Sequence, residues 1–527
     1  MTTAAPTQHH TTADLIDYAA LQYGSRIFIH EGEKALSFAM VHQQVCHLAN
    51  ALVARDFKQG DRAAIWAPNC AEWIVAALAI QYVGGTLVTV NTRYKPSEAR
   101  EILADSGSCV AFVVESFLGT QYAEALAEQD LPLLQHIVAL PSPNTSDQTS
   151  YHQWINEGMS ASEAICQKRD ALRDSIGPET VSDILFTSGT TGRAKGVVTA
   201  HGQNLQAFDI FAEILGLVDS DRYLIINPFF HSFGYKAGWL ASLLRGATVY
   251  PMAVFDVPAV LDAISRHAIT VMPGPPTLFQ SILMHPDRAN VDIASLTKAT
   301  TGAATIPTQL IVDMKEILGI DTVITAYGLS ETCGLVTMCR RGDAPDIIAS
   351  TSGRAIPGIE VSIMRADGSL ASTDETGEIV VRGFNVMQCY FNNELATAAT
   401  IDENGWLHTG DIGSLDAGGN IRITDRLKDM FISGGFNCYP AEIENQLLNH
   451  VDVAQVAVVG MPDERMGEVT AAFVVRAVSS QMHEADLISW SRAQMANYKV
   501  PRRVIFVDAL PLNASGKVLK TELRALL

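Results

Sequence analysis

Short apolar, β-branched runs alternate with helical patterns along most of this 527-residue chain. Between residues 63 and 114 the pattern predicts a strand at 63–66, a helix at 72–83, and strands at 86–90 and 110–114. Strands that are separated by helices form largely parallel sheets with helices packed on their faces. The sequence therefore predicts an α/β fold.

The pattern of predicted strands and helices changes twice further along the chain. The same alternation resumes with strands at 183–187, 223–227, 248–252 and 322–326, and helices near 237–244 and at 257–267. After about residue 353, short strands punctuated by Gly predict a β-rich subdomain. The last hundred residues show their own α+β pattern, with helices at 441–448 and 484–495 and strands at 453–459, 471–475 and 504–507. We expect a large N-terminal domain, residues 1–427, and a small C-terminal domain, residues 428–527.

Composition excludes several classes of protein. The formal net charge of −20 is spread along the chain, which disfavours a nucleic-acid or anionic-membrane surface. The eight cysteines include no CxxC pair, so neither a zinc site nor a disulfide framework is expected. The N-terminus lacks the pattern of a secretory signal, and the most apolar stretch, residues 74–90, is short for a membrane span and is interrupted by Gly84 and Gly85. We expect a cytoplasmic protein without a membrane span.

The strongest local signal is the string ILFTSGTTGRAKGV at residues 184–197, in which a buried strand runs into a turn rich in Ser, Thr and Gly. Its glycines let backbone amides converge on an anion, while hydroxyl groups and Arg193 and Lys195 add donors and positive charge. The candidate phosphate-binding residues are Thr187, Ser188, Gly189, Thr190, Thr191, Gly192 and Lys195. The spacing of the glycines does not satisfy the Walker pattern, which disfavours a P-loop kinase. A flexible Ser/Gly hairpin is the alternative.

This string resembles the phosphate-loop signature of the adenylate-forming superfamily, which includes acyl-CoA synthetases, luciferases and adenylation domains of peptide synthetases. Ala194 stands where the signature usually has Pro. Further blocks match the superfamily in the same order, so the resemblance covers nearly the whole chain. It implies an N-terminal adenylation domain and a mobile C-terminal domain.

Three of the matching blocks imply nucleotide contacts. In the block at 326–332, Tyr327 corresponds to the aromatic that stacks on adenine, and Glu331 to the acid that holds Mg²⁺; Thr187 is a second candidate for the metal. In the block at 406–411, Asp411 corresponds to the acid that binds the ribose. At 425–429, Arg426 corresponds to a ribose and phosphate contact and Lys428 to the hinge. The remaining candidates at the nucleotide are Ala326, Gly328 and Ser330.

Two blocks in the last hundred residues imply the residues that act in the two reaction steps. Lys517, after a Gly in the block at 511–518, matches the catalytic lysine that bridges the substrate carboxylate and the α-phosphate and so counters developing charge. Ser433, Gly434 and Gly435, in the block at 431–444, match the face that lines the pantetheine tunnel during thioester formation. A solvated tail lysine and a plain β-turn are the ordinary alternatives.

The acid-binding region is less clearly marked. His231, in the segment 227–239, corresponds to a residue that borders the acyl channel. The channel would be lined by Phe229, Phe230, Phe233, Tyr235 and Trp239, with Gly302, Ala303 and Ala304 opposite. The segment also looks like that of ligases acting on the ring-derived propanoate of steroid catabolism. Lys236 is either a partner for a distant keto group of such an acid or, more simply, a surface lysine.

Together the resemblance implies an AMP-forming acid–CoA ligase that uses ATP, Mg²⁺ and coenzyme A. The expected substrate is a fatty acid or a bulky alicyclic acid such as a steroid-derived ring propanoate. Transfer of the adenylate to a carrier protein, a luciferase-like oxidation, and a non-catalytic nucleotide-binding protein are the alternatives. The expected partners are small molecules, with no nucleic acid, and the protein is expected to be a monomer or a homodimer.

Overall fold

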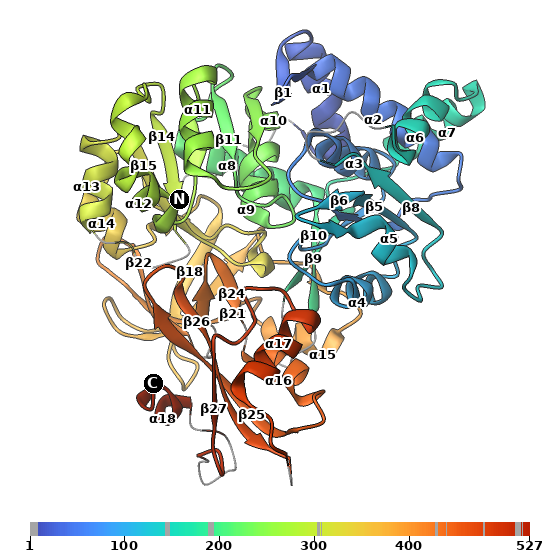
Figure 1. Ribbon diagram of the computed structural model, residues 1–527. Helices are drawn as coiled ribbons and strands as arrows, with labels where there is room; N and C mark the ends of the chain where they lie inside the picture. The colour runs from blue at the N-terminus through green and yellow to red at the C-terminus, as the bar shows by residue number, and fades with distance from the viewer. Residues whose placement is uncertain are drawn as a thin grey trace.

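The computed structural model describes residues 9–142, 148–187, 194–302, 306, 308–426, 431–438, 440–477, 480–511, 518 and 520–527. Two large sheets lie side by side in the N-terminal part, and a smaller unit lies beneath them (Figure 1). The predicted α/β fold with a β-rich subdomain and a small C-terminal domain is confirmed. The predicted boundary after residue 427 lies outside the described residues, so the division at that position stays a prediction.

The first sheet has nine strands, and its central strands are parallel, as the alternation predicts. In spatial order they are β17 (Arg354–Ala355), β16 (Thr337–Met338), β15 (Thr322–Tyr327), β14 (Lys298–Thr301), β13 (Val271–Pro273), β11 (Arg222–Ile225), β12 (Thr248–Pro251), β1 (Ile27–Glu31) and β2 (Lys34–Ser37). Parallel strands end at one edge, where α/β proteins place ligands. The ends of β11, β14 and β15 therefore bring three of the predicted site segments together.

The second sheet has seven strands. In spatial order they are β20 (Cys389–Tyr390), β10 (Lys195–Ala200), β9 (Val181–Thr187), β4 (Thr86–Thr89), β3 (Arg62–Trp66), β5 (Val110–Val114) and β8 (His136–Leu140). Strands β9 and β10 form an antiparallel hairpin, and β20 pairs with β10 on the outer side. The predicted phosphate loop is the connection between β9 and β10.

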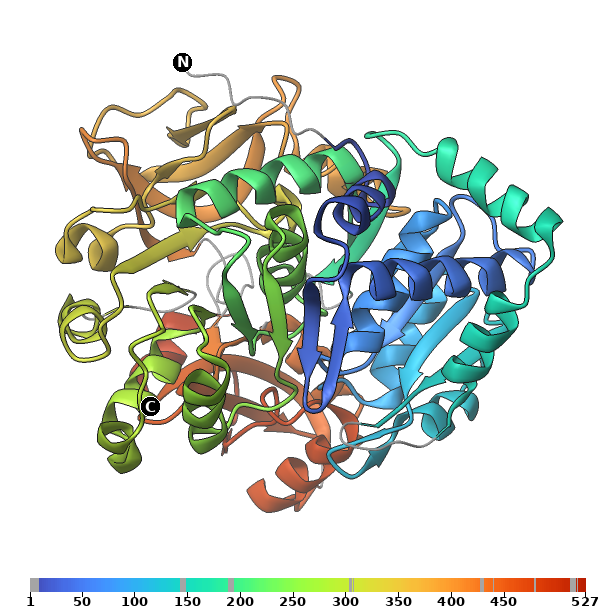
Figure 2. The same cartoon turned by 90° about the horizontal axis from the view of Figure 1, so that it is seen from above.

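Helices cover both sheets (Figure 2). Helix α3 (Ala71–Tyr82) is buried at every residue, as expected for a helix that is apolar on all sides. The longer helices of the N-terminal part are α1 (Thr12–Tyr23), α2 (Phe38–Val53), α3 (Ala71–Tyr82), α4 (Pro96–Ser106), α6 (Ser150–Met159), α7 (Glu163–Asp174), α8 (His201–Leu215) and α11 (Val257–His267). Within the described residues, none of the helices has the length and apolar character needed to cross a membrane.

The β-rich subdomain is a four-stranded antiparallel sheet. Its strands are β18 (Ile359–Met364), β19 (Gly377–Gly383), β21 (Leu407–Leu415) and β22 (Ile421–Arg426). Strand β21 carries Asp411, and β22 ends at Arg426, two residues before the predicted hinge residue Lys428. The sheet therefore links the predicted ribose-binding residues to the predicted hinge.

The C-terminal domain is a five-stranded sheet with helices on both faces. Its elements are β23 (Phe431–Ser433), β24 (Phe436–Cys438), α16 (Pro440–Leu448), β25 (Val453–Asp463), β26 (Gly467–Arg476), α17 (Glu484–Gln494), β27 (Arg503–Phe506) and α18 (Lys520–Ala525). Side chains of α16 and α17 pack in one apolar cluster, and Leu523 of α18 packs in another on the other side of the sheet. The domain thus has its own core.

Candidate active site

The two residues that flank the phosphate loop face each other across the hairpin. Thr187 and Lys195 are paired in the register of β9 and β10, and the Thr187 hydroxyl donates a 3.4 Å hydrogen bond to the Lys195 carbonyl. The predicted loop residues Ser188, Gly189, Thr190, Thr191 and Gly192 lie outside the described residues. The structure therefore fixes where the loop begins and ends.

At the base of this loop, one tyrosine contacts both a carboxylate and an ammonium group. The hydroxyl of Tyr390 donates a 2.8 Å hydrogen bond to Oε1 of Glu331, and Nζ of Lys195 lies 4.7 Å from the centre of the Tyr390 ring. Pairing of β20 with β10 places Tyr390 there, while Glu331 lies in the short helix η3 (Ser330–Thr332). The sequence analysis missed Tyr390, because a Tyr within a short strand carries no motif.

A single carboxylate beside a phosphate loop fits Mg²⁺ better than metals that need several protein ligands. Among the described residues, no three His, Cys, Asp and Glu side chains are grouped so that they could hold a metal ion. Mg²⁺ usually binds one or two carboxylates and takes its other ligands from water and substrate phosphates. Glu331 is thus a suitable holder of Mg²⁺, with the Thr187 hydroxyl at the start of the loop as a second oxygen donor.

The predicted adenine-binding and ribose-binding residues lie in direct contact. The Tyr327 hydroxyl donates a 2.7 Å hydrogen bond to Oδ2 of Asp411, and both side chains are almost fully buried. Asp411 is in turn paired with Arg426 in the register of β21 and β22. Three motifs that are far apart in the sequence thus converge at the edge of the first sheet where β15 ends.

The turn after β15 requires close approach of two backbone segments. A Cβ atom on Gly328 would lie 2.2 Å from the carbonyl oxygen of Gly334, so only glycine fits this position. Gly302, at the end of β14, lies beside the carbonyl oxygen of Ala326, while Ala303 and Ala304 are outside the described residues. Ser330 begins η3 next to Glu331. The close turn holds the loop that carries the predicted metal ligand.

The segment predicted to line the acyl channel divides into an accessible and a buried part. His231 is exposed and caps the short helix α9 (Ser232–Gly234) by accepting a hydrogen bond from the Phe233 amide. Although the His231 ring keeps accessible surface, the protein around it desolvates the ring and lowers its pKa below the usual 6.5, which favours the neutral imidazole. Phe230 and Phe233 keep some accessible surface. These residues remain the candidates for the channel wall.

Three of the aromatics expected in that channel lie in the core instead. Phe229, Tyr235 and Trp239 are fully buried. The rings of Tyr235 and Trp239 stack with their centres 4.8 Å apart, and Trp73 packs edge-on against Phe229 and Trp239. The predicted helix near 237–244 is a π-helix, η1 (Tyr235–Leu240), followed by α10 (Ala241–Arg245). Helical periodicity alone does not distinguish an inward-facing stripe that binds a ligand from one that packs in the core.

Neither of the two interpretations of Lys236 is correct. Lys236 is buried, with a side-chain exposure of 1%, and its ammonium lies 3.0 Å from the equally buried carboxylate of Asp183 and donates a hydrogen bond to Thr199. Ser182 and Asn204 also donate hydrogen bonds to Asp183. This network, which the sequence analysis missed, joins η1 to both strands of the phosphate-loop hairpin.

The Ser433–Gly435 turn of the C-terminal domain faces the N-terminal body. Gly434 and Gly435 have φ of 58° and 82°, in the region that favours glycine, and a Cβ atom on Gly435 would lie 3.9 Å from the Pro275 ring. Pro275 follows β13, at the edge where the site residues meet. The predicted thioester face is therefore presented to that edge.

The predicted catalytic lysine and hinge lysine, Lys517 and Lys428, lie outside the described residues. Val518, the neighbour of Lys517, packs with the cluster around Leu523. That cluster lies on the face of the C-terminal sheet opposite to the one against which α16 and α17 pack. Val518 therefore lies on the other face of the sheet from the helices α16 and α17.

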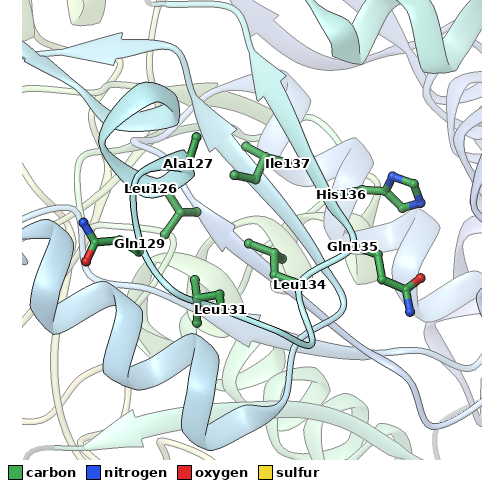
Figure 3. Close-up of a pocket in the computed structure, with 8 residues that line it drawn as sticks. All are labelled: Leu126, Ala127, Gln129, Leu131, Leu134, Gln135, His136 and Ile137. Carbon is green, nitrogen blue, oxygen red and sulfur yellow. The ribbon is translucent and has the colours of Figure 1, made fainter.

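A surface pocket elsewhere on the molecule is not part of this site. It has a volume of about 270 Å³ and lies between α5 (Tyr122–Ala127) and β8, in the second sheet. Figure 3 shows apolar side chains such as Leu131 and Leu134 turned inward and the polar groups of Gln129 and His136 turned away. The pocket thus offers no convergent polar groups to a ligand.

Comparison with known proteins agrees with this arrangement. Residues 16–391 match the AMP-binding enzyme family and residues 442–517 match the AMP-binding enzyme C-terminal domain. A Rhodococcus jostii protein named 3-[(3aS,4S,7aS)-7a-methyl-1,5-dioxo-octahydro-1H-inden-4-yl]propanoyl:CoA ligase is 47% identical over 98% of this chain and 99% of its own length.

Two solved structures show the same fold. The o-succinylbenzoate CoA synthetase of Bacillus subtilis, a double mutant bound with a product analogue, OSB-NCoA, superposes with a TM-score of 0.82 at 31% identity over 97% of this chain and 98% of its own. ATP-bound MatB of Rhodopseudomonas palustris superposes with a TM-score of 0.69 at 27% identity over 98% of each chain. From the matched domains, the near-complete relative and the shared fold, we conclude that this chain belongs to the AMP-binding enzyme family.

Proposed function

We propose that this protein is an AMP-forming acid–CoA ligase whose substrate is a bulky alicyclic propanoate of the kind named in its Rhodococcus relative. The observation that carries the proposal is the convergence of Lys195, Glu331, Tyr327 and Asp411, from three sheets, around the loop that follows β15. The Ser433–Gly435 turn faces the same side of the N-terminal body. The first four residues are suited to bind a nucleoside triphosphate, and the turn that faces them is suited to admit the thin pantetheine arm of CoA.

In the first step, a carboxylate oxygen of the acid attacks the α-phosphorus of ATP, pyrophosphate leaves, and an acyl-adenylate forms. Two anions must approach each other, so the reaction requires positive charge and hydrogen-bond donors placed in advance. Lys195 and the loop amides serve the phosphates, Tyr327 and Asp411 hold the nucleoside, and Lys517 bridges the two reacting groups. Mg²⁺ held by Glu331 and Thr187 would neutralise phosphate charge when bound.

In the second step, the sulfur of CoA attacks the acyl carbonyl, the thiol proton is lost, and AMP leaves with the electrons of the broken acyl–oxygen bond. We assign residues 1–427 to the adenylation domain and 428–527 to a mobile domain that turns about Lys428 between the steps. The position of Gly435 beside Pro275 supports an orientation suited to the second step.

The acid is proposed to lie between the ends of β11 and β14. Phe230, His231 and Phe233 would form an apolar wall with a neutral imidazole, and Gly302 leaves room opposite them. An apolar wall with few polar groups favours an apolar fused-ring acid over a small polar one.

Mass spectrometry of acyl-CoA products from a mixture of acids tests the proposal. Straight-chain acids of increasing length, aryl acids and the dioxo-octahydroindenyl propanoate are supplied together with ATP, Mg²⁺ and CoA. Each acid that gives a product is then assayed on its own. We expect the bicyclic acid to have the highest kcat/KM of these acids. A higher kcat/KM for a straight-chain acid would contradict the proposed substrate while leaving the ligase reaction intact.

A further inference from the structure

A lysine at the boundary between the two domains is enclosed by carboxylates from both. Lys499, in the C-terminal domain, has a side-chain exposure of 2%. Its ammonium lies 2.9 Å from Oε1 of Glu98 on α4 of the N-terminal body and also forms an ion pair with Glu442 on α16 of its own domain. Figure 1 shows α4 lying above α16 and α17. The ring of Tyr94 lies 4.4 Å from the same ammonium.

Aromatic contacts next to this ion pair join the same two domains. The rings of Tyr498 and Phe436 stack with their centres 4.6 Å apart, and Phe436 follows the Ser433–Gly435 turn directly. From the N-terminal body, Asn91 donates a 3.2 Å hydrogen bond to the Tyr498 hydroxyl, and the Arg93 guanidinium lies 5.7 Å from the Phe436 ring. The ion pair and the turn are therefore parts of one contact surface.

The charges in this contact allow the domains to separate without leaving a buried charge unpaired. If the domains part, Lys499 keeps Glu442 as its partner, and Glu98 keeps the hydrogen bond that it accepts from the Lys95 amide. In the docked arrangement, however, Glu98 gains a desolvated cation, which makes the interaction strong. Burial raises the pKa of Glu98 by desolvation and the Lys499 ammonium opposes that rise, so the docked arrangement depends on this pair staying intact.

We propose that Glu98 is a positioning residue that, through Lys499, stabilises the domain orientation in which the Ser433–Gly435 turn faces the active site for thioester formation. This inference rests on the proposed two-step function. Glu98 acts only through the domain contact, because it lies on α4 and has no described contact with Thr187, Lys195, Glu331 or Tyr327. Its loss must therefore slow the CoA step and spare the first step.

The test measures the two half-reactions separately in the full-length Glu98→Gln variant. Gln keeps the shape and the oxygen that accepts from the Lys95 amide but removes the negative charge. Acid-dependent exchange of pyrophosphate into ATP reports the first step, and single-turnover conversion of preformed adenylate by CoA reports the second. We expect exchange within twofold of the wild type and a CoA step slowed about tenfold, the effect of losing a hydrogen bond to a charged partner.

Glu101→Gln is the matched control, since Glu101 lies on the same helix but is exposed. It should leave both half-reactions unchanged. Glu98→Lys, which places a second cation against Lys499, should slow the CoA step more than Glu98→Gln does. Equal slowing of both half-reactions by Glu98→Gln, or slowing of neither, would overturn the inference. Absence of acid-dependent exchange in the wild type would instead contradict the proposed function itself.

Discussion

The Tyr327 hydroxyl and the Asp411 carboxylate, 84 residues apart in the sequence, are joined by a 2.7 Å hydrogen bond. This bond fixes the end of β15 to the β-rich subdomain and fixes the direction of a carboxylate that is only 2% exposed. A buried carboxylate that is oriented in advance binds a pair of hydroxyl groups at a lower entropic cost than a mobile one does. The proposed ribose site is thus already formed before the nucleotide binds.

Replacement of Asp411 by Asn should weaken nucleotide binding. The variant keeps the size of the side chain but loses its charge, and hydrogen bonds to charged groups contribute about 1.5–3 kcal/mol. We expect the KM for ATP to rise about tenfold or more in steady-state measurements of pyrophosphate release. Tyr327→Phe, which keeps the ring, should show a smaller rise. Asp416→Asn, in the turn between β21 and β22, is the control and should leave the KM for ATP unchanged.

Glu331→Gln should lower the rate of adenylate formation and alter its dependence on Mg²⁺. The variant removes the carboxylate of Glu331 beside the phosphate loop while keeping an acceptor for the Tyr390 hydroxyl. We expect a fall of about 10²-fold in acid-dependent pyrophosphate exchange, comparable to the loss of other groups that stabilise charge in a transition state. The Mg²⁺ concentration for half-maximal exchange should rise. An unchanged Mg²⁺ titration would show that Glu331 does not hold the metal.

Lys236→Met should destabilise the fold without changing the preference for keto acids. The substitution leaves Asp183 buried without its cation, and breaking such a pair costs about 3–5 kcal/mol. Chemical denaturation measures this loss. The double variant Lys236→Met with Asp183→Asn should recover part of the free energy of unfolding, because no lone charge remains buried. A selective loss of activity on keto acids, with normal stability, would instead support a direct role in substrate binding.

His201 should make the protein sensitive to mild acid. Complete burial lowers the pKa of His201 to about 4 from 6.5, and its Nδ1 accepts a hydrogen bond from the Thr12 amide. A base with a lowered pKa in the folded state contributes stability that is fully present above pH 6.5 and is lost as the pH falls toward 4. The difference between a pKa of 6.5 and one of about 4 corresponds to a loss of about 3 kcal/mol in the free energy of unfolding. Denaturation at pH 7 and 4.5 should show this loss, and His201→Gln should reduce the difference between the two values.

The sequence predicted elements where the signal is local. The strand Val110–Val114 and the helix Val257–His267 occur with the expected bounds, since each is marked by its own periodicity and by flanking turn residues. The candidates Tyr327, Glu331 and Asp411 came from motifs and not from periodicity, and the structure places them at one sheet edge.

Contacts between distant segments could not be predicted in the same way. The Tyr390 hydroxyl reaches Glu331 only because β20 pairs with β10, and Lys236 is buried only because Asp183 lies on the strand beside it. Neither partner is encoded in the neighbouring sequence. The roles of Lys236, Tyr235 and Trp239 were misjudged for the same reason, since an inward-facing residue can contact either a ligand or the core.

The central claim is that one chain both forms an acyl-adenylate and transfers the acyl group to CoA. The most direct test is a single-turnover reaction with excess enzyme, ATP, Mg²⁺ and the bicyclic propanoate, followed by quenching before and after CoA is added. We predict that acyl-adenylate and pyrophosphate accumulate first, and that CoA then converts the adenylate to acyl-CoA and AMP in equal amounts. Adenylate that persists after CoA is added, with no thioester formed, would contradict the account.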